Sequence, residues 1–207
     1  MMYFTDRQEA ALQLTAKIIK HKSPQTIVLA IPRGGVPIGC ALAKALSAPL
    51  DLLMAKKIGH PFDPEFAIGA VCANETIIEE TGSVKKEYIA QQLEQIKKEL
   101  SDRYRHLTSR ERPLPLYQKK VIITDDGIAT GRTLLHAIEI CREHHPQAIW
   151  VGVPVSSRDA ASRIQPKVDR FLCLHQPDPF IGVGQFYKSF PSVSDKEVVE
   201  SLQSNDR

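Results

Sequence analysis

Apolar residues recur along this chain in two patterns, short continuous runs and positions at helical spacing. The run at 26–31 is apolar almost throughout and ends at Pro32, which is typical of a strand buried on both faces. In contrast, 6–21 carries apolar residues at helical spacing behind an aspartate near its start. The same reasoning predicts further strands at 50–55, 121–124, 148–155 and 168–174, and helices at 36–46, 84–107, 132–144, 158–164 and 195–202.

Strands that alternate with helices from end to end indicate an α/β fold, a Rossmann-like parallel sheet flanked by helices. The 207 residues are enough for one core, so a single domain over 1–207 is expected. Two stretches lack periodicity. The segment 56–82, rich in Gly and Pro, is expected to be an irregular, mobile loop with short strand-like pieces at 68–72 and 76–78. The stretch 176–207 is expected to be a small C-terminal segment ending in a helix.

Composition narrows the class of protein without changing this fold. A hydrophobic content of 43% and a charged content of 25% are those of an ordinary globular protein, and no apolar run is long enough to cross a membrane. The net charge of +3 comes without a long basic run, so no nucleic-acid partner is expected. The four cysteines are far apart, and the first residues do not resemble a secretory signal, so a cytoplasmic location is expected.

The end of the strand at 121–124 carries the most specific chemistry. Asp125 and Asp126 follow it, and a turn of small residues over 127–133 then opens onto a predicted helix. A helix N-terminus behind such a turn binds phosphate, and paired carboxylates accept hydrogen bonds from neighbouring hydroxyls. This combination predicts a sugar-phosphate site, whereas a simple helix cap is the plainer alternative. The spacing fits neither a Walker loop nor a dinucleotide-binding loop.

A second unusual strand end follows 26–31. Arg33, Gly34 and Gly35 stand at a strand-to-helix junction, where a guanidinium and backbone amides can bind an anion. Taken alone, this segment is also compatible with an ordinary tight turn and a solvated arginine.

The segment 121–134 resembles the phosphoribosyl-pyrophosphate signature of type I phosphoribosyltransferases, and the whole chain is similar to stand-alone bacterial proteins of that family. The resemblance implies the type I fold, with Asp125 and Asp126 on the ribose hydroxyls and Arg33, Gly34 and Gly35 in a pyrophosphate loop. An aspartate that hypoxanthine-type members use as a base is replaced here by Ala129. The residues implied to wrap the 5′-phosphate are Gly127, Ile128, Ala129, Thr130, Gly131, Arg132 and Thr133.

By the same resemblance, 56–82 stands at the place of the family's mobile loop, which closes over the site. Lys56 and Lys57 are candidates for binding the pyrophosphate, and Glu65 for an acid or base; a solvated lysine pair is an equally good interpretation. The tail resembles a base-binding hood, with Phe180 as a stacking residue or as ordinary core. Pro179 stands where hypoxanthine-type enzymes carry a lysine, so 6-oxopurine specificity is not expected.

The resemblance implies an enzyme of nucleotide salvage that transfers a 5-phosphoribosyl group from phosphoribosyl pyrophosphate to a purine or pyrimidine base. Arg33, Asp125, Asp126 and Glu65 are the catalytic candidates. Mg²⁺ is the implied cofactor, held mainly through substrate oxygens and by Asp125, and a homodimer is expected. A module that senses phosphoribosyl pyrophosphate without catalysis, and a sugar-phosphate hydrolase, are the alternatives.

Overall fold

The computed structural model describes residues 3–72, 75–78 and 84–205. Its centre is a five-stranded parallel sheet in the order β2-β1-β6-β7-β8. These strands are β1 (Thr26–Ala30), β2 (Leu50–Leu52), β6 (Lys120–Thr124), β7 (Ala148–Val155) and β8 (Arg170–His175). The predicted α/β fold with helices on both faces of a parallel sheet is confirmed.

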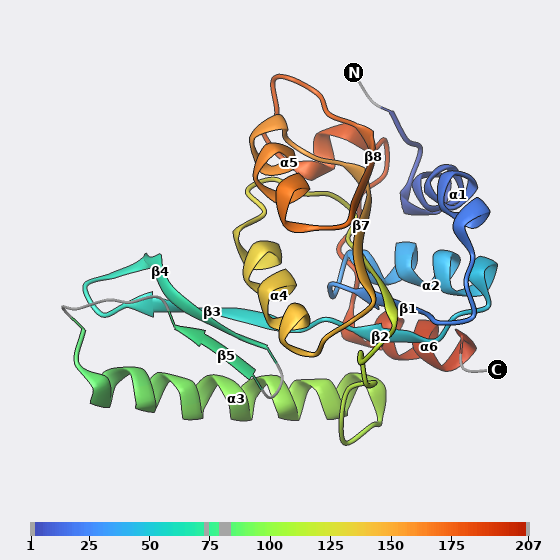
Figure 1. Ribbon diagram of the computed structural model, residues 1–207. Helices are drawn as coiled ribbons and strands as arrows, with labels where there is room; N and C mark the ends of the chain where they lie inside the picture. The colour runs from blue at the N-terminus through green and yellow to red at the C-terminus, as the bar shows by residue number, and fades with distance from the viewer. Residues whose placement is uncertain (1–2, 73–74, 79–83, 206–207) are drawn as a thin grey trace.

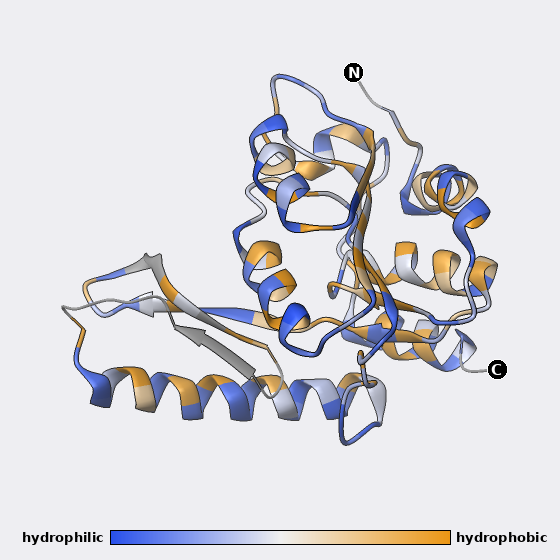
Figure 2. Ribbon diagram, in the orientation of Figure 1, coloured by the Kyte–Doolittle hydropathy of each residue, from blue (hydrophilic) through white to orange (hydrophobic). Residues whose placement is uncertain are grey.

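Helices cover both faces of the sheet (Figure 1). On one face lie α1 (Arg7–Ile18), α2 (Gly35–Leu46) and α6 (Asp195–Asn205). On the other lie α4 (Arg132–Glu143) and α5 (Arg158–Ile164). Each side encloses its own apolar cluster. In Figure 2 the hydrophobic colour follows the strands and the helix faces beside them, which is the burial pattern that the continuous apolar runs predict. No described helix combines the length and the apolarity needed to cross a bilayer.

Short 3₁₀ turns and caps complete these elements. The Asp6 carboxylate begins α1 by accepting hydrogen bonds from the amides of Gln8 and Glu9, both at 2.9 Å. The Ser157 hydroxyl caps α5 in the same way. The 3₁₀ turns are Ile19–His21, Gln165–Lys167 and Val183–Phe186.

The stretch 56–82, predicted to be irregular, is largely β-structure where it is described. It contains β3 (Ala55–His60), β4 (Asp63–Cys72) and β5 (Glu75–Ile78), which form an antiparallel sheet in the order β3-β4-β5. The pairing of β3 with β4 shifts register around Gly59, and such a shift interrupts the alternation by which strands are recognised. This sheet projects from the body together with α3 (Lys86–Thr108) (Figure 1).

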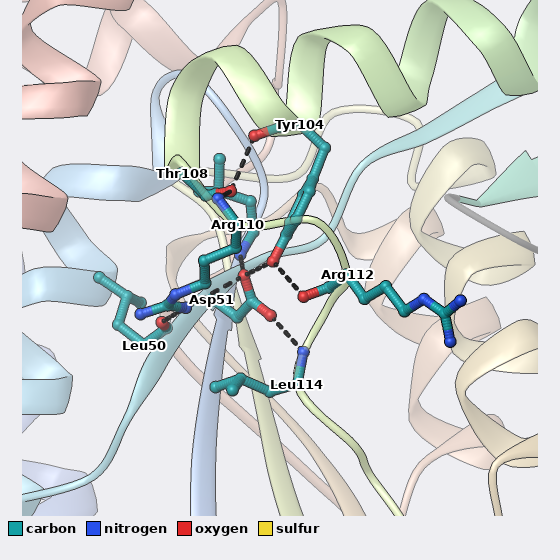
Figure 3. A network of polar contacts seen from close by, with 8 residues as sticks. Leu50, Asp51, Tyr104, Thr108, Arg110, Arg112 and Leu114 are labelled. Carbon is teal, nitrogen blue, oxygen red and sulfur yellow. Dashed lines mark hydrogen bonds and ion pairs between the residues drawn. The ribbon is translucent and has the colours of Figure 1, made fainter.

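A buried carboxylate joins α3 to the parallel sheet. Asp51 of β2 is fully buried and accepts hydrogen bonds from the Tyr104 hydroxyl at 2.8 Å and from the Leu114 amide at 2.7 Å. Arg110 lies 3.6 Å from the same carboxylate and donates to the carbonyl of Leu50 (Figure 3). Burial and the Asp51 charge raise the pKa of Tyr104, so this hydroxyl stays protonated and donates. The end of α3 and the segment after it are thereby fixed to β2.

Removing the Tyr104 hydroxyl should weaken this junction. We expect Tyr104→Phe to lower the free energy of unfolding by about 1–3 kcal/mol, because a buried carboxylate loses a hydrogen-bond donor. Urea unfolding measures the change, and Tyr117→Phe, which alters a side chain that is 63% exposed, is the control. Equal effects of the two substitutions would contradict the role given to Asp51.

Candidate functional site

The two predicted ligand loops meet at the carboxyl ends of β1 and β6. Strand order reverses between these neighbours, and ligands of open α/β sheets bind at such a switch point. Ala30 pairs with Thr124, and the amide of Ile31 donates to the Thr124 carbonyl at 2.9 Å. A Cβ on Gly35 would lie 2.8 Å from that carbonyl oxygen and 2.9 Å from the Asp125 Cα. Only glycine lets the loops approach this closely.

The loop after β6 encloses a cavity of about 220 Å³ at the N-terminus of α4. Gly131 takes the left-handed conformation, with φ of 68°, and turns the chain into the helix. The loop is held from the side of α5, where Ser157 donates to the Ala129 carbonyl at 2.6 Å and Arg163 to the Thr130 carbonyl at 2.9 Å. The first amides of a helix have no partner within it and are available to an anion. The lining residues are Ile31, Asp125, 127–134 and Val183.

The loop after β1 borders a second, larger cavity of about 450 Å³. The peptide bond between Pro32 and Arg33 is cis. Three cationic side chains line this cavity, Arg33, Lys56 and Arg103, together with the carboxylate of Glu99. Ile31 and Thr133 line both cavities, so the two adjoin. The larger cavity is thus a second place suited to an anion, next to the helix N-terminus.

The two adjacent aspartates lie in different surroundings. Asp125 lines the smaller cavity, is only partly buried, and its Oδ1 accepts the amide of Asp126 at 2.8 Å. Burial first, and the neighbouring Asp126 charge second, raise the pKa of Asp125 well above its ordinary value. Its carboxyl group therefore faces the ligand side in an environment that disfavours its charge.

Asp126 instead faces the interior, where Arg7 binds it. The Arg7 Nε and Nη2 atoms lie 2.9 and 2.8 Å from one Asp126 oxygen, and the two side chains are 11% and 12% exposed. Arg7 also stacks 3.8 Å above the Phe190 ring and donates to the Pro191 carbonyl at 2.7 Å. Burial raises the pKa of Asp126, and Arg7 opposes that rise. Asp126 is not among the residues that line either cavity.

Asp126 also fixes the loops around it. A Cβ on Gly34 would lie 2.0 Å from an Asp126 carboxylate oxygen, so this glycine of the loop after β1 packs directly on the side chain. The Tyr187 hydroxyl donates to the Asp126 carbonyl at 2.6 Å. Through its carboxylate and its backbone carbonyl, Asp126 thus joins the N-terminal helix, the loop after β1 and the C-terminal segment.

Among the other predicted site residues, Lys56 lines a cavity, whereas Lys57 and Phe180 do not. Lys56 lines the larger cavity and pairs with Glu99 at 2.7 Å, whereas its neighbour Lys57 does not line it, since successive strand residues point to opposite faces. Phe180 packs against Phe186, with ring centroids 5.0 Å apart, at the edge of the apolar cluster. The backbone of Glu65 lies in β4, and its side chain lies outside the described residues.

Sequence reasoning missed Arg7, Arg103 and Val183. Arg7 is 119 residues from Asp126 and lies in an ordinary amphipathic helix, so no local pattern marks it. Arg103 is one of many charged residues along α3, so its position in the sequence does not distinguish it. Val183, rather than Phe180, is the tail residue that lines the smaller cavity.

Replacement of Arg7 tests how much the stability of the protein depends on the ion pair with the buried Asp126 carboxylate. We expect Arg7→Gln to destabilise the protein by about 3 kcal/mol at pH 8, because it leaves a buried carboxylate without its partner. Without Arg7 the pKa of Asp126 rises further, so the carboxyl is protonated in the native state at lower pH and the loss shrinks towards pH 5. Urea unfolding at both pH values measures this, and Arg7→Gln combined with Asp126→Asn should recover part of the loss. A loss independent of pH would contradict the ion pair as its cause.

Comparison with known proteins identifies the family of the chain. The family model for the phosphoribosyl transferase domain matches residues 6–187. A Mycobacterium tuberculosis protein named "Putative phosphoribosyl transferase" is 35% identical over 211 residues, which cover 98% of this chain and 47% of that protein. The chain therefore spans about half the length of the curated relatives that it matches.

Solved structures agree on the fold. The crystal structure of TT1426 from Thermus thermophilus superimposes with a TM-score of 0.88 at 28% identity, covering 98% of this chain and 99% of that one. A hypoxanthine-guanine phosphoribosyltransferase from Bacillus anthracis shares the fold alone, with a TM-score of 0.52 at 13% identity over 90% of each chain. The matched family model spans both ligand loops and the whole parallel sheet, and the chain therefore belongs to the phosphoribosyl transferase domain family.

Proposed function

We propose that this chain transfers a 5-phosphoribosyl group from phosphoribosyl pyrophosphate to the nitrogen of a purine or pyrimidine base and releases pyrophosphate. The observation that carries the proposal is the pair of adjoining cavities, which share Ile31 and Thr133. One has a helix N-terminus and the other three cationic side chains. A sugar with a phosphate at one end and a diphosphate at the other matches such a pair.

In this proposal the residues of the smaller cavity hold the 5′-phosphate. The first amides of α4 and the hydroxyls of Thr130 and Thr133 donate to its oxygens. Asp125 accepts hydrogen bonds from the ribose hydroxyls, and its carboxylate stabilises positive charge as it develops at the anomeric carbon. Asp126 has a supporting role here rather than an equal one, because Arg7 already binds its carboxylate.

The larger cavity takes the leaving group. As the bond between the anomeric carbon and the pyrophosphate oxygen breaks, its electron pair goes to pyrophosphate, and Arg33 stabilises that negative charge. The base nitrogen forms the new bond to the anomeric carbon, and its proton passes to solvent water. Val183 on the wall of the smaller cavity gives the base an apolar contact.

The donor set fits Mg²⁺ that is bound largely through substrate. Among the described residues no three His, Cys, Asp or Glu side chains gather into a metal site. Asp125 supplies one carboxylate at the cavity wall, and Mg²⁺ commonly takes one or two carboxylates, with substrate phosphates and water completing its coordination. When bound, the ion would neutralise charge on the diphosphate.

Binding of phosphoribosyl pyrophosphate is the first test. At about one hundred times its Kd, the ligand should raise the melting temperature by about 5–10 °C in the presence of Mg²⁺. Arg33→Ala should reduce the shift and cut turnover at least about tenfold, whereas Arg142→Ala, far along α4 from the loops, should change neither. Release of pyrophosphate that depends on an added base identifies catalysis and the acceptor. Binding without release would favour a sensor, and no shift at millimolar ligand would refute the proposal.

Asp125→Asn should have opposite effects on stability and on ligand binding. Because the pKa of Asp125 is raised in the folded state, the native protein loses stability as pH rises from about 4 through that higher pKa. The amide escapes this loss, so we expect the variant to melt about 2–4 °C higher than wild type at pH 8, with the gap closing towards pH 4. It should also lose the ligand-induced shift.

The matched control is Asp102→Asn, whose side chain is 53% exposed on α3 and lines neither cavity. It should change neither the melting temperature nor the ligand-induced shift. An Asp125→Asn protein that is less stable than wild type at pH 8 would show that burial of this charge does not oppose folding.

A further inference from the structure

The larger cavity has a wall that the two ligand loops do not supply. Glu99, Leu100 and Arg103 of α3 line it together with Arg33. The helix belongs to the projecting part of the molecule, yet its C-terminal half runs back under the parallel sheet (Figure 1). One cation of this cavity, Arg103, is therefore carried by α3 and not by a strand end.

Arg103 and Arg33 point at a single oxygen atom. The Oδ1 atom of Asp195, the first residue of α6, lies 3.3 Å from Nη2 of Arg103 and 3.6 Å from Nη1 of Arg33. The two guanidinium groups therefore converge closely enough to share one oxyanion. Guanidinium groups bind phosphate oxygens in the same manner as carboxylate oxygens, so a phosphate group can be shared by both.

The ion pairs around this cavity are weak enough to be exchanged. Arg33, Arg103 and Asp195 are 46%, 44% and 39% exposed, and Lys56 pairs with Glu99 at a similar exposure. Exposed ion pairs of this kind contribute little to stability. Three cations here face two carboxylates, and one diphosphate would offer all three cations an acceptor at once.

We propose that Arg103 is a third cation of the pyrophosphate site, and that pyrophosphate displaces Asp195 from Arg33 and Arg103 when it binds. The inference rests on the proposed function, since it assigns the diphosphate end of the substrate to this cavity. It makes Arg103 a substrate-binding residue and Asp195 an internal competitor of the leaving group. Binding of a diphosphate would then weaken the polar contact between α3 and α6.

Calorimetric titration of the full chain with inorganic pyrophosphate, in the presence of Mg²⁺, tests this assignment. Arg103→Gln should weaken pyrophosphate binding about tenfold while leaving the Kd of ribose 5-phosphate within about twofold of wild type. Asp195→Asn should tighten pyrophosphate binding about two- to fivefold, because a competing carboxylate is gone. Arg105→Gln is the matched control, since Arg105 pairs with Asp102 and Glu111 and does not line the cavity.

Two results would overturn the inference. One is Arg103→Gln binding pyrophosphate as tightly as wild type. The other is Asp195→Asn binding it no more tightly than wild type, which would make Asp195 an aligning group and not a competitor. Should Arg103→Gln fail to fold, the Asp195→Asn titration decides alone. A wild-type chain that binds neither pyrophosphate nor ribose 5-phosphate would refute the proposed function itself. If the wild type binds both ligands and Arg103→Gln binds pyrophosphate equally tightly, only this inference is refuted.

Discussion

The close approach of two strand ends is the constraint on which the rest of the site depends. Ala30 and Thr124 are paired neighbours, so the loops that follow them leave the sheet side by side. Gly34 and Gly35 allow the loop after β1 to lie directly on Asp126 and on the Thr124 carbonyl. A side chain at either position would push the loops apart, and the two cavities would no longer adjoin. Backbone contact, more than any single functional group, sets the distance between the two cavities.

This contact brings two carboxylates close together, one buried and one partly buried at the cavity wall, and their surroundings differ. Asp126 receives a dedicated partner, because the Arg7 guanidinium, stacked on the Phe190 ring, binds its carboxylate, while the Tyr187 hydroxyl binds its backbone carbonyl. Asp125 receives no comparable cation from the described part of the protein, and its pKa rises accordingly. An acid pair in which one member is neutralised internally and the other is left facing the cavity suits a site that must accept hydroxyl groups or a cation. The internal pairing also explains why segments from both ends of the chain meet at this place.

The sequence carries the local features of this arrangement and not the distant ones. The buried strands and the residues of both ligand loops are contiguous, so runs of apolar residues and turn glycines were sufficient to predict them. Arg7, Arg103 and Asp195 reach the site through tertiary packing, and a charged residue on a helix surface has no local mark of such a role. The strand-like pieces at 68–72 and 76–78 correspond to the end of β4 and to β5, whereas β3 and the first half of β4 were missed, because a register shift and glycines interrupt their alternation. Their apolar residues Ile58 and Ile68 are buried in the same cluster as Ile96 and Leu100 of α3.

The position of α3 links the stability of the fold to the chemistry of the larger cavity. Arg103 and Tyr104 are consecutive on this helix, where successive side chains point about 100° apart. Tyr104 turns inward to the buried Asp51, whereas Arg103 turns to the cavity. Because Asp51 lies in β2, next to β1, the hydrogen bond from Tyr104 fixes α3 to the sheet that carries the loop of Arg33. Apolar packing and the buried hydrogen bond from Tyr104 to Asp51 thus hold α3 in the position that brings the adjacent Arg103 to the larger cavity.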